Sequence, residues 1–295
     1  MEFLKEYNYK KELCEKKIRE IFENEEFQSE SLKEIMEYAV LNGGKRIRPV
    51  IFLSAFELLD SDIERALDFA CALEFIHSYS LVHDDLPCMD NDDLRRGKPT
   101  CHKKFSEYGA VLAGDALLNF AFEKMLSEAD NFDLNYSLYA MRIIADASGN
   151  KGMCAGQMAD MSQDIETYQK LSKMYENKTG ALLKASVLGG FTLAGGFHNK
   201  TNDYYILEEF AKLLGLIFQI KDDLLDVEST DEILGKPTFS DEKNDKNTFV
   251  RQYGKEKCKE LICEYKNKAT KLLSSLEYNT EFLKGLVVYT AEREK

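Results

Sequence analysis

Two aspartate clusters, each at the end of an apolar stretch, constrain the fold of this chain more than any other feature. The first occupies residues 83–90 (HDDLPCMD) and the second residues 221–226 (KDDLLD). Carboxylates packed together repel one another and lose solvation, so such clusters are costly unless cations neutralise them. Oxygen ligands without neighbouring pairs of Cys or His favour Mg²⁺, which often bridges a few carboxylates to phosphate oxygens. The two clusters therefore predict a cation site that acts on phosphate.

The spacing of apolar residues is helical rather than alternating in segment after segment. Residues 66–85 and 204–226 are apolar on most faces, which is typical of helices at the centre of a fold. The run 42–44 (Asn-Gly-Gly) ends one helix with glycine at the left-handed cap, and Pro49 lies in the opening turn of the next. We find no convincing strand. The sequence therefore predicts an all-α fold.

Composition limits the number of domains and the class of partner. Four prolines and no Gly/Ser-rich linker interrupt the 295 residues, which favours a single domain over residues 1–295. The net charge of −13 argues against nucleic acid or an anionic membrane as a partner. The best apolar run, residues 213–220, is too short for a membrane span, and residues 1–15 lack a signal-peptide core. With seven cysteines and no CxxC pair, we expect reduced thiols, no zinc and a cytoplasmic location.

The position of the clusters strengthens the cation hypothesis. Taken alone, either cluster is better interpreted as a solvated acidic helix end. A helix C-terminus already carries partial negative charge, however, so an aspartate cluster there is unfavourable. Two aspartate clusters at helix C-termini in one chain therefore indicate bound cations. Pro87 should end the first helix and leave Asp90 to reach back from a loop, whereas Asp222, Asp223 and Asp226 can share one helix face. The clusters can meet only if the two helices pack side by side with their carboxyl ends at one mouth.

Two groups of basic residues lie where they could bind an anion. Lys45, Arg46 and Arg48 follow the glycine turn, and alone they fit a capped helix junction as well as an anion site. Arg95 and Arg96 follow the first aspartate cluster closely. They could form a salt-bridged surface loop, but their position favours a diphosphate clamp, because Arg matches phosphate oxygens bidentately.

Weaker signals come from single polar residues on the predicted helices. His77 lies two helical turns before Asp84 and so points along the same face toward the mouth. A lone His on an apolar helix is more often a core residue, but this alignment favours a substrate contact. Lys178, Thr179 and Gln219 are weak signals in isolation, since helix-interior Thr and Gln usually have structural roles.

Taken together, these strings resemble the trans-isoprenyl diphosphate synthases, most closely the bacterial farnesyl diphosphate synthase (geranyltranstransferase) group. Residues 83–100 (HDDLPCMDNDDLRRGKPT) are similar to the first aspartate-rich motif of the family, with the two-residue insertion typical of the bacterial group. Residues 218–227 (FQIKDDLLDV) are similar to the second motif. Residues 112–117 (LAGDAL) and 156–160 (GQMAD) are family-like strings in the expected order. The resemblance extends from Gly43 to about Thr248. It implies the isoprenoid synthase fold, a single-domain helical bundle around a central cavity.

The resemblance implies a head-to-tail condensation of dimethylallyl or geranyl diphosphate with isopentenyl diphosphate. It places two Mg²⁺ ions on Asp84 and Asp90 and a third on Asp222, with Mn²⁺ as an alternative ion. Further ligands or supporting carboxylates would be Asp85, Asp223 and Asp226. The allylic diphosphate would be gripped by Arg95, Lys178, Lys236 and Lys246. Isopentenyl diphosphate would lie against Gly44, Lys45, Arg48, His77 and Arg96. Oxygen atoms that stabilise the allylic cation would come from Thr179 and Gln219.

Product length is implied by the fifth residue before the first aspartate, which floors the hydrocarbon pocket in the family. That residue is Tyr79, beside the small Ser80, and an aromatic floor implies farnesyl diphosphate (C15). A C20 or C10 product remains an alternative. At Thr238-Phe239 the chain departs from the family, which usually has a glycine before Ser-Asp, and this departure bears on the reach of Lys236.

Rivals of another class are a terpene cyclase, an all-α metal-dependent pyrophosphohydrolase and a non-catalytic partner subunit. The first two need only one diphosphate site, so the set Lys45, Arg48 and His77 argues against them. A non-catalytic subunit should have lost aspartates, and both clusters are intact. Family habit implies a homodimer.

Overall fold

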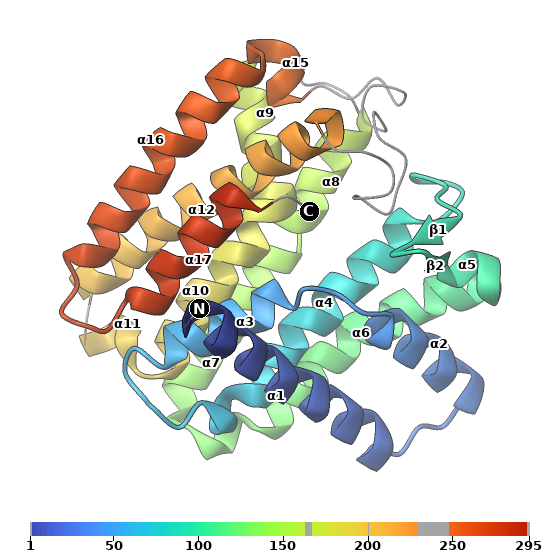
Figure 1. Ribbon diagram of the computed structural model, residues 1–295. Helices are drawn as coiled ribbons and strands as arrows, with labels where there is room; N and C mark the ends of the chain where they lie inside the picture. The colour runs from blue at the N-terminus through green and yellow to red at the C-terminus, as the bar shows by residue number, and fades with distance from the viewer. Residues whose placement is uncertain (1, 163–166, 200, 229–247, 294–295) are drawn as a thin grey trace.

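The computed structural model describes residues 2–162, 167–199, 201–228 and 248–293. Lys236, Lys246 and the departure at Thr238-Phe239 lie outside the described residues. The helices and strands of the described part are, in chain order, α1 (Glu2–Asn24), α2 (Glu30–Leu41), α3 (Ile47–Phe56), η1 (Ile63–Ala66), α4 (Leu67–Asp84), β1 (Leu94–Arg95), β2 (Lys98–Pro99), α5 (Cys101–Lys104), α6 (Glu107–Ser127), η2 (Ala129–Asn131), α7 (Leu134–Ser148), α8 (Met153–Ser162), α9 (Tyr168–Tyr175), η3 (Glu176–Gly180), α10 (Ala181–Leu193), α11 (Gly196–Asn199), α12 (Thr201–Glu228), α15 (Phe249–Tyr253), α16 (Lys255–Ser274) and α17 (Glu281–Glu292). The all-α prediction is confirmed (Figure 1).

The helices form two halves joined by α3 and α10. In Figure 1, α1, α2, α4 and α6 lie in one half, and α12, α15, α16 and α17 lie in the other. Helix α4 packs mainly on α6 and α3, whereas α12 packs mainly on α16 and α10. Each aspartate-bearing helix therefore packs mainly on other helices, with α3 and α10 between the two. The apolar faces of α3 and α10 are buried between them, because those helices are almost entirely apolar.

The predicted helix boundaries near the first basic group are confirmed. Helix α2 ends at Leu41, Gly43 follows with a left-handed φ of 83°, and Pro49 lies in the first turn of α3. Helix α4 ends at Asp84, so Pro87 lies in the following loop as expected. Helix α12 runs two residues past Asp226 to Glu228.

One structure was missed by the sequence analysis, a short β-hairpin after the first aspartate cluster. Leu94 pairs with Pro99 and Arg95 with Lys98, and the two turn residues, Arg96 and Gly97, both have positive φ. Positive φ at both central residues is the signature of the tight two-residue hairpin turn. Strands of two residues are too short to show alternating periodicity, so no sequence signal was available.

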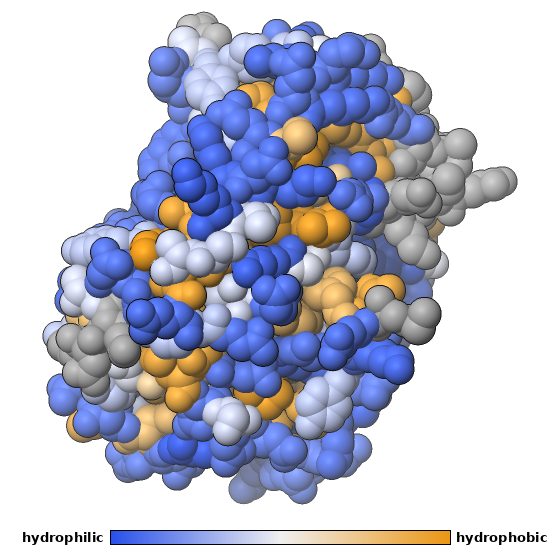
Figure 2. Space-filling view, turned by 60° about the vertical axis from the view of Figure 1, so that its left-hand side comes forward, coloured by the Kyte–Doolittle hydropathy of each residue, from blue (hydrophilic) through white to orange (hydrophobic). Residues whose placement is uncertain are grey.

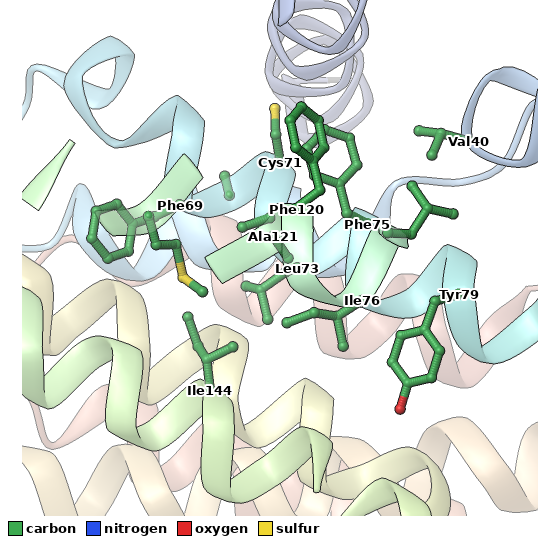
Figure 3. Close-up of a cluster of buried hydrophobic side chains, with 14 of the residues drawn as sticks. Val40, Phe69, Cys71, Leu73, Phe75, Ile76, Tyr79, Phe120, Ala121 and Ile144 are labelled. Atoms are coloured by element: carbon green, nitrogen blue, oxygen red, sulfur yellow. The ribbon is translucent and has the colours of Figure 1, made fainter. Parts of the chain in front are cut away.

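The core around α4 leads directly toward the predicted site. Phe69, Phe75 and Ile76 are fully buried, and they pack with α6 residues such as Phe120 (Figure 3). Tyr79 lies at the end of this cluster, with its hydroxyl directed away from the α4 backbone (Figure 3). Tyr79 is only 7% exposed, so the core ends on an aromatic ring that carries a polar hydroxyl.

Figure 2 shows a face dominated by hydrophilic side chains, with hydrophobic ones in smaller patches. None of the helices in the described residues has the length and apolar character that a membrane crossing requires.

Candidate active site

A cavity of about 530 Å³ opens between α3, α4, α8 and the π-helix η3. Its walls are largely apolar, with the side chains of Met89, Met153, Met158 and Met161 among them. Seven of the predicted site residues line this cavity, namely Arg48, His77, Tyr79, Ser80, Asp84, Lys178 and Thr179. A mostly apolar pocket with a few convergent charged groups is the usual form of a ligand site.

The first aspartate cluster is folded back on itself as predicted. The amide of Asp90 donates to the carbonyl of Asp84 at 2.9 Å, which returns the loop to the end of α4. Asn91 takes the left-handed conformation needed for this return, with φ of 52°. Burial raises the pKa of Asp84 to about 6, with Asp90 and Asp85 adding to the shift and Lys178 and Arg95 opposing it. Asp84 is therefore a carboxylate whose environment favours an added cation.

Asp85, the residue that follows α4, forms a bidentate ion pair with Arg95. The Nε atom of Arg95 lies 2.8 and 2.9 Å from the two carboxylate oxygens of Asp85. Burial raises the pKa of Asp85, although the bond to Arg95 opposes this shift. The next residue, Arg96, instead donates to the carbonyl of Gly43.

The predicted contact surface for the second substrate is assembled at the glycine turn. Arg96 donates to the carbonyl of Gly43 and packs against Gly44. A Cβ atom at Gly44 would lie 2.8 Å from the Arg96 guanidinium, and its φ of 137° is also strained for other residues. Glycine is therefore required at position 44 for the approach of Arg96. Lys45 is exposed on the same turn.

The three cations after the turn have two different roles, which the sequence did not distinguish. Arg46 adopts φ of 55°, turns inward and pairs with Glu74 at 2.6 Å, and both side chains are at most 2% exposed. Its Nη2 atom donates to the carbonyl of Val40 at 2.8 Å. Arg48 instead lines the cavity, and burial lowers its pKa to about 10 while Glu74 opposes this shift. Arg46 is thus a buried support for the turn.

His77 is held neutral in the cavity wall. Burial lowers its pKa well below the usual value, and nearby arginines add to the shift, namely Arg48, Arg96, Arg95 and Arg46. A neutral imidazole can donate one hydrogen bond and accept another. This state fits a polar contact to a substrate surrounded by cations.

We expect this histidine to make the folded protein less stable in mild acid. Since its folded-state pKa lies below the unfolded value of about 6.5, its stabilising effect is complete above that pH and is lost as pH falls. One proton contributes a slope of at most about 1.4 kcal/mol per pH unit. Urea unfolding between about pH 7 and about pH 5.5 should show a shallower decline for His77→Gln than for the wild type. Equal slopes would contradict the neutral histidine.

The π-helix η3 presents Lys178 and Thr179 to the cavity. Single-turn π-helical segments inside α-helices occur frequently at functional sites. Lys178 pairs with Asp160 of α8 at 2.5 Å, so it is held close to Asp84. A Cβ atom at Gly156 would lie 2.1 Å from the Lys178 amide nitrogen, so only glycine lets α8 approach this closely. Asp160 had no predicted role, although the family-like segment 156–160 was an available signal for it.

The second aspartate cluster is connected to the cavity through Thr179. The Thr179 hydroxyl donates to Oε1 of Gln219 at 2.9 Å. The Nε2 atom of Gln219 faces Asp223 at 3.4 Å, and the Tyr175 hydroxyl and the Phe249 amide each donate to Oδ2 of Asp223 at 2.9 Å. Asp223 therefore anchors α9 and α15 to α12.

Asp222 of this cluster faces a different neighbour from Asp223. Asp222 accepts from Nη2 of Arg293 at 2.6 Å, and Arg293 also donates to the carbonyl of Phe218. Its guanidinium stacks over the Phe218 ring at 4.2 Å from the centroid. Asp226 is buried, at 3% exposure. Asp222 is thus already paired with a cation, supplied by the residue that follows α17.

Among the residues that the structure describes, no three Asp, Glu, His or Cys side chains converge as a ready-made metal site. Two of the predicted metal ligands do not point toward the others, because Asp85 and Asp222 each pair with an arginine. The donors nevertheless fit Mg²⁺, since they are carboxylates in loops and helix ends and Asp84 has a raised pKa. A cation at Asp84 would offset the repulsion from Asp90.

Comparisons with known proteins agree with this geometry. The family model for polyprenyl synthetase matches residues 29–279. A farnesyl diphosphate synthase of Micrococcus luteus is 42% identical over 268 residues, which cover 90% of each chain. A chloroplastic geranylgeranyl pyrophosphate synthase of Capsicum annuum is 43% identical over 252 residues, covering 83% of this chain and 67% of the relative. The crystal structure of a geranyltransferase of Helicobacter pylori, complexed with magnesium and isoprenyl diphosphate, has a TM-score of 0.81 at 30% identity and covers 97% of this chain and 96% of its own.

The helical fold and the charged, apolar-walled cavity are those of a prenyltransferase. The chain belongs to the polyprenyl synthetase family. The family predicted from the aspartate-rich motifs is therefore confirmed, and so is an enzymatic rather than a purely structural role.

Proposed function

We propose that this enzyme condenses dimethylallyl or geranyl diphosphate with isopentenyl diphosphate, head to tail, and stops at farnesyl diphosphate. The observation that carries the proposal is the cavity itself. Asp84 and Lys178 line the cavity with Arg48 and His77, and Tyr79 lies five residues before Asp84 on the same helix. Five residues of α-helix rise about 7.5 Å, which separates a charged end from an aromatic floor.

The chemistry requires a site that stabilises a leaving diphosphate and shields a carbocation. Mg²⁺ would be held by Asp84, Asp90 and Asp222, and when bound it supplies positive charge to the diphosphate oxygens. Asp85, Asp223 and Asp226 would support these ligands. The complex of a Helicobacter pylori relative with magnesium and isoprenyl diphosphate supports the choice of ion. The number of ions, three in our proposal, is a prediction from the resemblance.

The residues of the chain would act by position and charge. Lys178 and Arg95 would bind the allylic diphosphate and stabilise the charge that develops on its oxygens. The methionine-rich wall excludes water from the cation, while the oxygens of Thr179 and Gln219 stabilise it without attacking it. The departed diphosphate would accept the proton released at the end of the reaction.

The second substrate would lie across the glycine turn. Lys45 and Arg96 are exposed there, and Arg48 and His77 line the adjoining cavity wall. The neutral His77 can contact a phosphate oxygen or its bound water as a hydrogen-bond donor. Lys236 and Lys246, outside the described residues, keep their predicted place on the allylic diphosphate.

The direct test is an incubation with Mg²⁺, labelled isopentenyl diphosphate and each allylic starter, followed by sizing of the product. Farnesyl diphosphate as the main product is the expected result. Formation of no prenyl diphosphate under these conditions would overturn the proposal. A C20 product would favour the second candidate, which the similarity to the Capsicum annuum geranylgeranyl pyrophosphate synthase supports.

Replacing the floor residue tests product length. Tyr79→Ala is expected to shift the main product from C15 to C20 or longer, because a buried ring at the end of the cavity is removed. Ser80→Ala, a smaller change at the neighbouring cavity position, serves as the matched control. Products are sized by LC-MS. An unchanged product length in Tyr79→Ala would contradict the assignment of Tyr79 as the floor of the hydrocarbon pocket.

The homodimer implied by the resemblance stays a prediction. Sedimentation velocity at micromolar concentration would test it. A single species at the monomer mass of 33.8 kDa would contradict it.

A further inference from the structure

The hydroxyl of Tyr79 is not free in the cavity floor. It lies 3.4 Å from Sγ of Cys154, which comes from α8 and also lines the cavity. The ring of Tyr79 meets the ring of His83 edge-on, with centroids 5.8 Å apart. Tyr79 is therefore held on one side by its own helix and at its tip by a different helix.

The direction of the hydrogen bonds follows from the number of protons. Sγ of Cys154 lies 3.2 Å from the carbonyl oxygen of Ser148, and a carbonyl can only accept. The single S–H proton of Cys154 is therefore donated to Ser148, and its sulfur must accept from Tyr79. Burial also raises the pKa of Tyr79, which keeps the hydroxyl protonated as a donor.

This chain of bonds joins three helices beneath the cavity. Ser148 is the last residue of α7, so its carbonyl is one of those that a helix end leaves without an intrahelical partner. The turn between α7 and α8 is tightly packed, since a Cβ atom at Gly152 would lie 2.1 Å from the carbonyl oxygen of Ala147. The position of Cys154 relative to Ser148 is thus set by the backbone of this turn.

We propose that Cys154 is a positioning residue for product length, which holds the ring of Tyr79 across the end of the cavity. The inference rests on the proposed function, in which Tyr79 limits the growing chain. Without the sulfur acceptor, the Tyr79 hydroxyl has no partner in the cavity wall and the ring can change its rotamer. A longer hydrocarbon then gains access to the space that the ring blocked.

The test compares product ratios in a set of matched variants. Cys154→Ala should raise the ratio of C20 to C15 product about fivefold or more, the factor expected for loss of one hydrogen bond. Cys154→Ser keeps a donor and an acceptor, so its ratio should stay within about twofold of the wild type. Cys263→Ala, a change at an exposed thiol on α16, should leave the ratio unchanged.

A double-mutant cycle separates the effect of the Tyr79–Cys154 hydrogen bond from the effect of a smaller side chain at position 154. Tyr79→Phe keeps the ring and removes the donor, so it should shift the ratio as Cys154→Ala does. The double variant should add little to either single change, because both remove the same bond. Thermal unfolding of each variant shows whether the fold is retained.

The outcomes distinguish this inference from the proposed function. If the wild type makes no prenyl diphosphate, the proposed function is wrong and the inference falls with it. If the wild type makes farnesyl diphosphate and Cys154→Ala gives the wild-type ratio of C20 to C15 product, only the positioning role of Cys154 is wrong. A ratio for Cys154→Ser as high as that for Cys154→Ala would also overturn it, since hydrogen bonding would then have no part.

Discussion

Replacing Asp84 by asparagine is expected to lower kcat/KM for condensation by at least about 100-fold, because one ligand of the cation that stabilises the leaving diphosphate is lost. Asparagine keeps the size of the side chain, so the fold around α4 should be retained. Burial raises the pKa of Asp84 to about 6, so a bound cation would favour the charged form of this carboxylate. Condensation is measured with labelled isopentenyl diphosphate at saturating Mg²⁺.

A second measurement tests the same residue without turnover. Mg²⁺ with inorganic pyrophosphate should raise the thermal unfolding temperature of the wild type and have little effect on Asp84→Asn, since only binding to the folded state stabilises it. Asp93→Asn is the matched control, because Asp93 is an exposed carboxylate of the same segment that pairs with Lys103. Full activity in Asp84→Asn, or equal loss in Asp93→Asn, would refute the metal-ligand assignment.

The second large effect is expected on stability at the buried pair Arg46–Glu74. Glu74→Ala should lower the free energy of unfolding by about 3–5 kcal/mol, the usual result of leaving one charge of a buried pair without its partner. The guanidinium of Arg46 is 1% exposed, and its Nε atom has only the more distant Glu15 carboxylate, 3.6 Å away. Water cannot replace the lost carboxylate without opening the core.

Urea unfolding measures this loss, with Glu281→Ala as the control. Glu281 pairs with Lys284 on the surface of α17, where its side chain is 78% exposed, so its removal should change stability by about 0.5 kcal/mol at most. A loss below about 1 kcal/mol in Glu74→Ala would contradict the buried-pair account. The variant should also lose affinity for isopentenyl diphosphate, because Arg46 supports the turn that carries Lys45.

Much of the fold followed from local sequence patterns. The helical periodicity, the glycine cap before Arg46 and the break at Pro87 each depend on residues within a few positions, and all three are confirmed. The two-residue strands were missed because so short a segment carries no period. The main packing partners of α4 and α12 did not follow from sequence, because an apolar helix fits many neighbours and sequence alone does not choose between them.

In the candidate site, too, some residues followed from local sequence patterns and others did not. Residue type and spacing were enough to select Asp84 and His77 from α4, the family resemblance pointed to Tyr79, and the structure places all three on one cavity. The roles of Arg46 and Asp160 depend on partners that lie 28 and 18 positions away in sequence. No short-range pattern reports such pairs, so these two residues were not selected.

By itself, the sequence determined the family, the helical class and the residues that bear charge around the cavity, because these depend on residue type and local spacing. Only the tertiary structure decided which partner each of these residues has. It turned Arg46 into the core and left Lys45 exposed, it directed Asp222 to Arg293 and Asp223 to Tyr175, and it placed Cys154 at the tip of Tyr79. The physical reason is that a hydrogen bond or ion pair extends only about 3 Å, and only packing between distant helices brings two side chains that close.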